Sequence, residues 1–147
     1  MITTAIVPYN DLEREELYEI LALRSAVFIV EQECFFQDVD SLDKTAHHLL
    51  MRENNTLIAY ARILPYEDGE RMSFGRLATT PLYRGRGLGK QMMTLILDYL
   101  QQHHPEQEIV ITAQCYLQKF YQHYGFDPQG NPFSLDGQPH ILMVKKP

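Results

Sequence analysis

Phe74-Gly75-Arg76-Leu77-Ala78-Thr79, followed closely by Arg84-Gly85-Arg86-Gly87-Leu88-Gly89, is the stretch that decides the fold of this chain. The first segment is apolar and typical of a strand, and a helical pattern of apolar residues begins at Leu88. A strand, a glycine-rich turn and a helix N-terminus together form a cradle for anions. Glycines let backbone N–H groups close on a ligand, and the helix end carries about half a positive charge. Arg84, Arg86 and Lys90 add full charges, so the segment predicts a ligand that carries phosphates.

Two common nucleotide-binding motifs do not fit this glycine turn. A P-loop requires Gly, four residues and then Gly-Lys-Ser/Thr, but Arg84 occupies the first Gly position and Gln91 replaces the Ser/Thr. The dinucleotide fingerprint fails because the three glycines are spaced two by two. The spacing Arg84-x-x-Gly87-x-Gly89 instead resembles the pyrophosphate-binding signature of the GNAT superfamily of acyl-CoA-dependent N-acyltransferases. The alternative interpretation is a glycine-rich turn with solvated arginines.

Length and composition limit the class of protein. A chain of 147 residues predicts a single domain over residues 1–147, with a real hydrophobic core. No apolar run approaches the ~20 residues that span a bilayer, and the N-terminus lacks the pattern of a signal peptide. Cys34 and Cys115 have no partners at metal-binding spacing and predict reduced thiols in a cytoplasmic protein. A net charge of −6 without basic runs argues against nucleic acid and weakly favours a cationic substrate.

The hydrophobic pattern predicts alternating strands and helices over the whole chain. We expect strands at 3–7, 48–52, 57–65, 71–79, 109–113, near 133 and at 140–144, and helices from an Asp11 cap to Phe28, at 88–104 and at 116–124. Residues 34–46 are acidic and irregular. The crossover through the middle helix is long enough to join parallel strands, whereas the hairpins are antiparallel. The fold class is therefore α/β, with a mixed, largely antiparallel central sheet flanked by helices on both faces.

Further segments strengthen the resemblance. Phe120-Tyr121-x-x-x-Gly125-Phe126 is similar to the end of the last GNAT helix, and other segments in the right order resemble the ElaA branch of that superfamily. These are Arg24-x-x-Val27-Phe28-x-Val30-Glu31-Gln32-x-Cys34, Asp38-x-Asp40-x-x-Asp43, Ala61-Arg62-Ile63-Leu64, Gly75-Arg76, Ala113-Gln114-x-x-Leu117-Gln118-x-Phe120-Tyr121 and Asp136-Gly137-x-Pro139-His140. The resemblance implies a GNAT fold and an N-acetyltransferase that uses acetyl-CoA as co-substrate, with no metal, and a small-molecule or peptide amine as acceptor.

The resemblance also implies where acetyl-CoA binds. The turn of Arg84, Gly85, Arg86, Gly87, Leu88, Gly89 and Lys90 would hold the pyrophosphate. Backbone groups of Leu77 and Thr79 would bind the pantetheine arm, and an N–H of Leu77 or Ala78 at a strand bulge would polarise the thioester carbonyl. Gln114, Leu117 and Phe120 would border the same ligand.

The resemblance implies a catalytic acid but does not assign the catalytic base. In the family a Tyr near the CoA sulfur acts as the acid, and Tyr121 matches that position, although a packed helix Tyr is the alternative. The base is unassigned, because Met72, Ser73 and Phe74 lack the carboxylate that many GNAT enzymes carry there. Glu31 and His140 are the leading candidates because both are expected at the acceptor mouth. The other candidates are Glu33, Asp38, Asp40 and His47.

Metal sites do not fit the sequence. Asp38-x-Asp40 opens like a calcium loop but lacks the Gly and Glu that such a loop requires, and the adjacent His47 and His48 face opposite ways on a strand. Two hypotheses remain: an N-acetyltransferase that works by direct attack in a ternary complex, and a non-catalytic acyl-CoA-binding sensor or regulatory module. The sequence leaves open the acceptor amine, and a homodimer is compatible with it.

Overall fold

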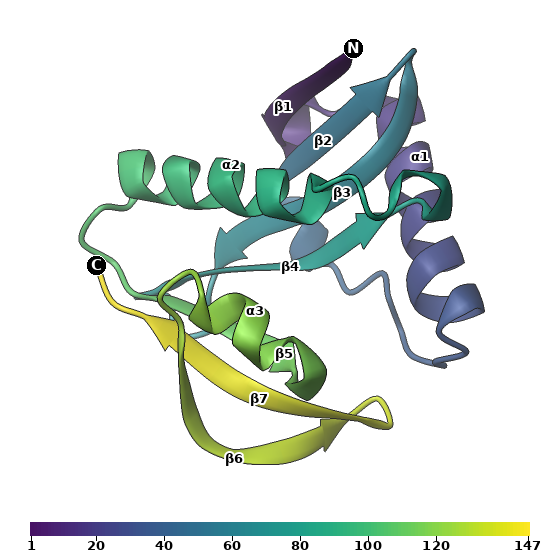
Figure 1. Ribbon diagram of the computed structural model, residues 1–147. Coiled ribbons are helices and arrows are strands. Elements are labelled where there is room, and N and C mark those ends of the chain that lie inside the picture. Colours follow the sequence, from purple (N-terminus) through teal and green to yellow (C-terminus); the bar gives the residue numbers. More distant parts are fainter.

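The computed structural model describes residues 1–147 as one seven-stranded sheet with three helices (Figure 1). The strand order is β1-β2-β3-β4-β5-β7-β6. The strands are β1 (Ile2–Pro8), β2 (His47–Glu53), β3 (Thr56–Pro65), β4 (Met72–Thr79), β5 (Ile109–Gln114), β6 (Asp127–Leu135) and β7 (Gln138–Lys145). The helices are α1 (Arg14–Arg24), α2 (Leu88–His103) and α3 (Gln118–Gln122). Every predicted strand and helix is present.

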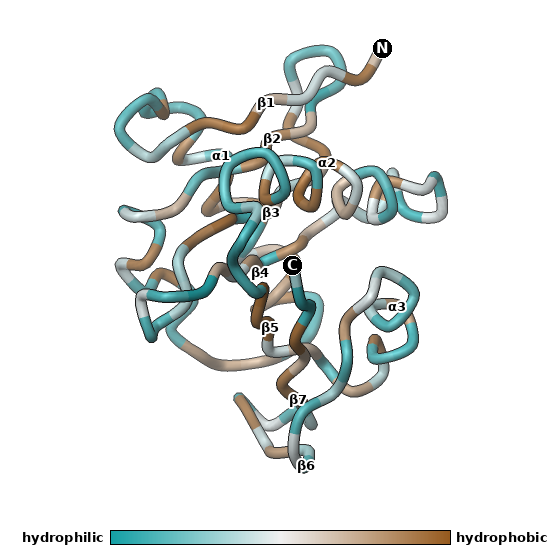
Figure 2. The backbone as a smooth tube through the Cα atoms, turned by 90° about the vertical axis from the view of Figure 1, so that its left-hand side faces the viewer, coloured by the Kyte–Doolittle hydropathy of each residue, from teal (hydrophilic) through white to brown (hydrophobic).

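Helices cover both faces of the sheet, as predicted. On β2, Leu49 and Met51 join the main core with α2 and α3, whereas Leu50 between them joins a smaller core with Ile20 of α1. Alternate residues of a strand point to opposite faces, so β2 is buried on both sides. Figure 2 shows the consequence: the central strands are hydrophobic, and the loops are mostly hydrophilic.

The first helix begins later than the sequence suggested. Asp11 lies in a short 3₁₀ turn, and the N-cap of α1 is Glu13. The side chain of Glu16 accepts a hydrogen bond from the Glu13 backbone N–H at 2.8 Å, which completes a capping box. The prediction of an Asp11 cap is therefore wrong. At its other end the helix continues as a π-helical turn over Ser25–Glu31, so the prediction that the apolar pattern to Phe28 is helical is confirmed.

Strands β4 and β5 are parallel, as the α2 crossover predicts, but they pair at one point only. Met72 lies opposite Ile109, and the Met72 N–H donates to the Glu108 carbonyl at 3.0 Å. All the other neighbouring strands are antiparallel over many residues. Beyond Met72 the edge of β4 that faces β5 is therefore free of ladder hydrogen bonds, and the sheet is split along it.

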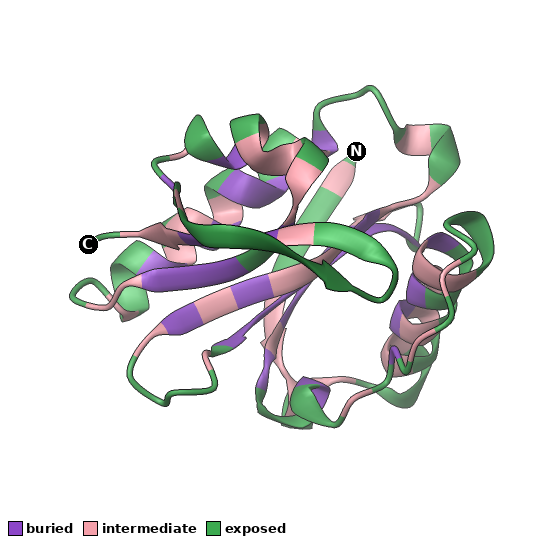
Figure 3. Ribbon diagram, turned by 90° about the horizontal axis from the view of Figure 1, so that it is seen from below, coloured by how far each residue is buried: buried purple, intermediate pink, exposed green.

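The last two strands form a hairpin that closes one side of the split. Its turn is Asp136-Gly137, with φ of 51° and 77°, the conformation that favours Asp-Gly in tight hairpins. Strand β6 is the sheet edge and is almost entirely exposed (Figure 3). Cys34 ties this hairpin to the loop after α1, because its thiol donates to the Asp136 carbonyl at 3.0 Å. None of the helices has the length and apolar character required to cross a membrane.

Candidate active site

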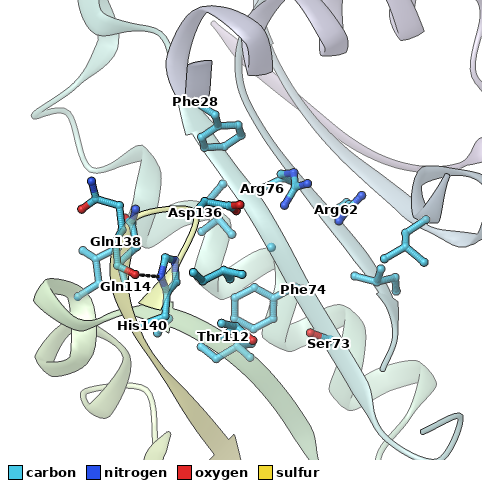
Figure 4. Close-up of a pocket in the computed structure, with 18 of the residues that line it drawn as sticks. Phe28, Arg62, Ser73, Phe74, Arg76, Thr112, Gln114, Asp136, Gln138 and His140 are labelled. Atoms are coloured by element: carbon cyan, nitrogen blue, oxygen red, sulfur yellow. Dashed lines mark hydrogen bonds between the residues drawn. The ribbon is translucent and has the colours of Figure 1, made fainter. Parts of the chain in front are cut away.

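A cleft of about 460 Å³ lies where β4 and β5 diverge (Figure 4). One wall is β4 from Ser73 to Leu77, and the other is β5 from Ile111 to Gln114, with His140 of β7 behind it. The β6–β7 turn, the loop after α1 and the end of β3 with the turn that follows it line the remaining sides of the cleft. Its surface is largely apolar, with a few polar side chains that converge on it, which is the usual character of a ligand site.

A β-bulge interrupts β4 at the mouth of this cleft. Tyr60 of β3 lies opposite Ala78, and Arg62 lies opposite Gly75, so Arg76 and Leu77 share one partner, Ala61. Arg76 has a left-handed φ of 54°. Such a bulge bends the strand and leaves a backbone group without a ladder partner. The bulge is therefore located at Arg76–Leu77 and includes Leu77, one of the two residues that the resemblance suggested.

The glycine turn leads into the N-terminus of α2 as expected. Gly85 and Gly87 have φ values of 77° and 80°, which explains why both are glycines. Gly87 is the N-cap of this 16-residue helix, and no side chain caps it. A Cβ at Gly85, Gly87 or Gly89 would meet no atom within 4 Å, so the concave side of the turn is open. The first N–H groups of α2 are thus available to an anion.

Cations surround this turn. The Arg84 Nε donates to the Thr79 carbonyl at 3.1 Å, which fixes the start of its side chain on the end of β4 and engages that carbonyl. The Arg86 guanidinium lies 4.7 Å from the centre of the Tyr83 ring, and Lys90 is exposed without an ion-pair partner. A second hollow of about 420 Å³ lies over the turn, and Gln32, Leu77 and Tyr116 border both it and the cleft.

Tyr121 lies on α3 and lines the cleft. Its side chain is 8% exposed, and its hydroxyl makes no hydrogen bond to any protein group, although the ring packs against Phe74 and Phe126. Burial raises the pKa of Tyr121 to about 12, with a smaller contribution from Tyr116. The phenol is therefore neutral at physiological pH and has an unused donor.

Glu31 does not lie where a base is needed. It ends the π-helical turn and forms a bidentate ion pair with Arg84, with 2.7 Å between Oε1 and Nη2. This pair is in the hollow over the glycine turn, and Glu31 does not line the β4–β5 cleft. The hydrogen bond from Arg84 lowers the pKa of Glu31. A weakly basic carboxylate at the glycine turn argues against the predicted role of Glu31 as the base.

Most other candidate bases are also engaged elsewhere. Asp38 and Asp40 are bound to arginines, and His47 packs against Tyr99 with 5.4 Å between ring centres, outside the cleft. Glu33 is exposed in the turn after Glu31. His140 does line the cleft, and its Nδ1 lies 2.9 Å from the Gln138 carbonyl oxygen (Figure 4). A carbonyl only accepts, so Nδ1 donates this hydrogen bond, and in the neutral form of the ring the lone pair is on Nε2.

The remaining predicted ligand contacts divide into two groups. Gln114 and Leu117 line the cleft, and Leu77, Thr79 and Leu88 line the hollow over the turn. Ala78 is buried at 2% exposure and borders neither space through its side chain. Phe120 also borders neither space, because its ring packs edge-on against Tyr121 and Tyr124.

A buried ionic network next to the cleft was not predicted as a network. Its members are three arginines and three aspartates: Arg24, Arg62, Arg76, Asp38, Asp40 and Asp43. Arg24 is fully buried, and five ion pairs of the network have nitrogen–oxygen distances of 3.0 Å or less. All six residues occur in the segments quoted for the ElaA resemblance. The sequence signal that could have identified the network is a single Arg on the predicted first helix, followed along the chain by a run of Asp residues.

Comparison with known proteins agrees with the fold. The family model described as acetyltransferase (GNAT) domain matches residues 10–147. The ElaA protein of Escherichia coli K12 is 39% identical over 99% of this chain and 97% of its own length. The crystal structure of E. coli ElaA has a TM-score of 0.93 over 99% of this chain and all of that one. An acyl-CoA N-acyltransferase from Pseudomonas aeruginosa has a TM-score of 0.94 and 34% identity over 99% of both chains. This chain therefore belongs to the GNAT acetyltransferase family.

Proposed function

We propose that this enzyme transfers the acetyl group of acetyl-CoA to a primary amine by direct attack in a ternary complex. One observation carries the proposal: the open glycine turn, the free edge of β4 and the unpartnered hydroxyl of Tyr121 lie along one continuous surface. The hollow over the turn and the β4–β5 cleft share Leu77 as a border. A ligand with phosphates at one end and a thioester at the other fits this arrangement.

The glycine turn would bind the pyrophosphate. The positive end of α2, its first N–H groups and the charges of Arg84, Arg86 and Lys90 act together on an anion in the open space over Gly85, Gly87 and Gly89. Arg84 would exchange the exposed carboxylate of Glu31 for a phosphate. Exposed pairs of this kind contribute little to stability because water and salt screen them, so the exchange is not costly.

Strand β4 would hold the pantetheine arm and polarise the thioester. Its edge toward β5 has backbone groups without ladder partners beyond Met72. The N–H of Leu77 at the bulge would donate to the carbonyl oxygen on which negative charge develops during attack. One pre-positioned donor of this kind contributes about 2.7–4 kcal/mol to catalysis in enzymes where it has been removed.

Tyr121 would protonate the leaving thiolate. A thiol has a reference pKa near ~8.5, so the neutral Tyr121 is the weaker acid of the two in water. Inside the cleft the same burial that raises the pKa of Tyr121 also raises the basicity of the thiolate. Since the hydroxyl has no protein acceptor, its proton is available to the sulfur.

His140 would take the proton from the amine. A primary ammonium has a reference pKa near ~10.4, so a neutral amine at pH 7 costs roughly 4–5 kcal/mol, and a base lowers that cost. His140 lines the cleft, and its hydrogen bond to the Gln138 carbonyl favours the tautomer of the neutral ring that has its lone pair on Nε2. No carboxylate stands on β4 to perform this step.

The acceptor would be a cationic amine on an apolar body. Phe28, Phe36 and Leu64 are among the apolar residues of the cleft wall. Both arginines in the wall are already bound to aspartates. The carboxylates of Glu67 and Asp136, which also line the cleft, have no ion-pair partner, so they attract a cation and repel an acceptor carboxylate.

Release of CoA, measured with a thiol reagent, tests this function. The acceptors should include matched pairs such as phenethylamine with phenylalanine and tyramine with tyrosine, together with polyamines and peptides. We expect CoA release with at least one amine and faster release with the carboxylate-free member of each pair. The alternative, a non-catalytic acyl-CoA-binding module, predicts that acetyl-CoA binds and that no acceptor releases CoA.

A further inference from the structure

Arg76 has a backbone conformation that is out of place in a strand. Six residues other than glycine have a positive φ, and five of them, Glu33, Ser41, Asn54, Asn55 and Asp136, lie in loops and turns. Arg76 is the sixth and is inside β4, with φ of 54°. The left-handed region is strained for an L residue with a long side chain, so neighbouring structure must hold Arg76 there.

The side chain of Arg76 is held on two sides. Its Nε donates to the Asp38 carboxylate at 2.8 Å, and its Nη2 donates to the Asp38 carbonyl at 3.1 Å and to the Asp40 carboxylate at 3.3 Å. Its guanidinium also lies 5.3 Å from the centre of the Phe36 ring. Asp38 therefore binds the guanidinium through both its side-chain carboxylate and its backbone carbonyl.

Asp38 is itself fixed to the end of α1. The fully buried Arg24 donates from Nε to the other Asp38 carboxylate oxygen at 3.0 Å and from Nη2 to the Asp38 carbonyl at 2.8 Å. The same Arg24 donates to Asp43 at 2.7 Å. A rigid connection thus runs from the helix through Asp38 to Arg76 in the bulge.

The bulge that this connection holds is the one that directs Leu77. We infer that the Asp38–Arg76 ion pair is a positioning device for acyl transfer: it maintains Arg76 in the left-handed conformation and thereby aims the Leu77 N–H at the thioester carbonyl. This inference rests on the proposed function, and it assigns Arg76 and Asp38 a role through the backbone rather than through contact with a substrate.

A comparison of Arg76→Ala with Arg76→Gly separates a role through the backbone from a role through contact with the substrate. Both variants lack the guanidinium, but glycine adopts a positive φ without strain whereas alanine does not. We expect Arg76→Ala to lower kcat about tenfold more than Arg76→Gly, the factor that corresponds to ~1.4 kcal/mol of conformational preference. Equal losses of kcat would overturn the inference and indicate that the guanidinium contacts the substrate. If Arg76→Ala does not fold, Arg76→Asn and Arg76→Gln replace the pair, since Asn tolerates this conformation better.

Arg52 provides the matched control. It is also an arginine in a strand, and it is held by a carboxylate of α1, with 3.0 Å from its Nη2 to Glu19, but its φ is not positive. The Gly variant of Arg52 should not have a higher kcat than the Ala variant, and it should have the lower melting temperature of the two. A glycine advantage at Arg52 as large as that at Arg76 would also overturn the inference.

A double-mutant cycle tests the part played by Asp38. Asp38→Asn should lower kcat in the wild-type background and have at least threefold less effect on kcat in the Arg76→Gly background, because the bulge no longer needs the ion pair. If the two substitutions have additive effects on kcat, Asp38 does not act through Arg76. The proposed function fails separately: if the wild-type enzyme acetylates no amine, the function is wrong, whereas an active enzyme with equal Ala and Gly variants leaves the function intact and removes only this inference.

Discussion

Gly87→Glu tests the phosphate cradle most directly. Gly87 is the N-cap of α2 with φ of 80°, and a Cβ there would meet no protein atom within 4 Å. The substitution therefore fits sterically, and its cost to the fold is the left-handed conformation of a non-glycine residue, ~1–2 kcal/mol. For a chain of this length 1 kcal/mol lowers the melting temperature by roughly 2–4 °C, so the variant should fold.

The effect on CoA affinity should be much larger. The new carboxylate would occupy the open space over the turn, where we place the pyrophosphate. Two unit charges about 4 Å apart repel by ~4 kcal/mol at an effective dielectric constant of 20. Even ~3 kcal/mol corresponds to more than about a hundredfold weaker binding. Isothermal titration calorimetry with CoA at low salt would measure this loss.

Gly130→Glu is the control for strain and added charge. Gly130 has φ of 72°, a Cβ there would also meet no atom within 4 Å, and the residue lies on β6 outside both spaces of the site. The variant should lose a similar amount of stability and retain the CoA affinity of the wild type. If the dissociation constants of the two variants agree within about threefold, the placement of the phosphates at the glycine turn is refuted.

Three further predictions concern the catalytic groups and the network. Tyr121→Phe should lower kcat about a hundredfold with unchanged CoA affinity in calorimetry, and wild-type turnover in this variant would make the residue structural. Because burial raises the pKa of Tyr121 to about 12, ionisation of this residue should not reduce the wild-type rate below about pH 11. His140→Ala should remove or shift the acidic limb of the rate–pH profile, whereas Glu31→Gln should retain that limb and change the KM for acetyl-CoA; the reverse result would restore Glu31 as the base. Burial alone would raise the pKa of Asp43, but hydrogen bonds from Arg24 and Arg62 outweigh it and lower that pKa. The contribution of Asp43 to stability is therefore complete above about pH 5 and is lost as the pH falls below ~4. Asp43→Asn should make the free energy of unfolding, measured by urea denaturation, decline less steeply in acid, and an unchanged decline would contradict the argument.

The elements of this fold were predictable because each depends on a local pattern. The glycine turn before α2, the β-branched run of β5 and the Asp-Gly hairpin each determine a backbone conformation within a few residues. The start of α1 was predicted wrongly for a related reason: Asp11 is a good cap residue, but Glu13 and Glu16 form the capping box. Two competing local signals so close together are resolved only by the path of the chain from β1.

The candidate site was less predictable, because its decisive contacts join residues that are far apart in the sequence. Glu31 pairs with Arg84, 53 positions away, and this contact is what makes it a poor base. No pattern along the chain indicates which carboxylate a given arginine will bind. Composition and motif spacing therefore predicted candidate residues for the site, but not their partners.

The ionic network shows why such partners matter for function. Three arginines and three aspartates balance in charge, so most of the group can be buried without leaving a charge uncompensated, and removal of a buried member such as Arg24 or Asp43 would leave such a charge. A purely stabilising role could be performed by apolar residues of the same volume at least as well. Apolar residues could not hold the guanidinium of Arg76 by directional hydrogen bonds, and that guanidinium belongs to the one strand residue other than glycine with a left-handed backbone, beside Leu77. The network is therefore better explained by the geometry that it imposes on β4 than by the stability that it contributes.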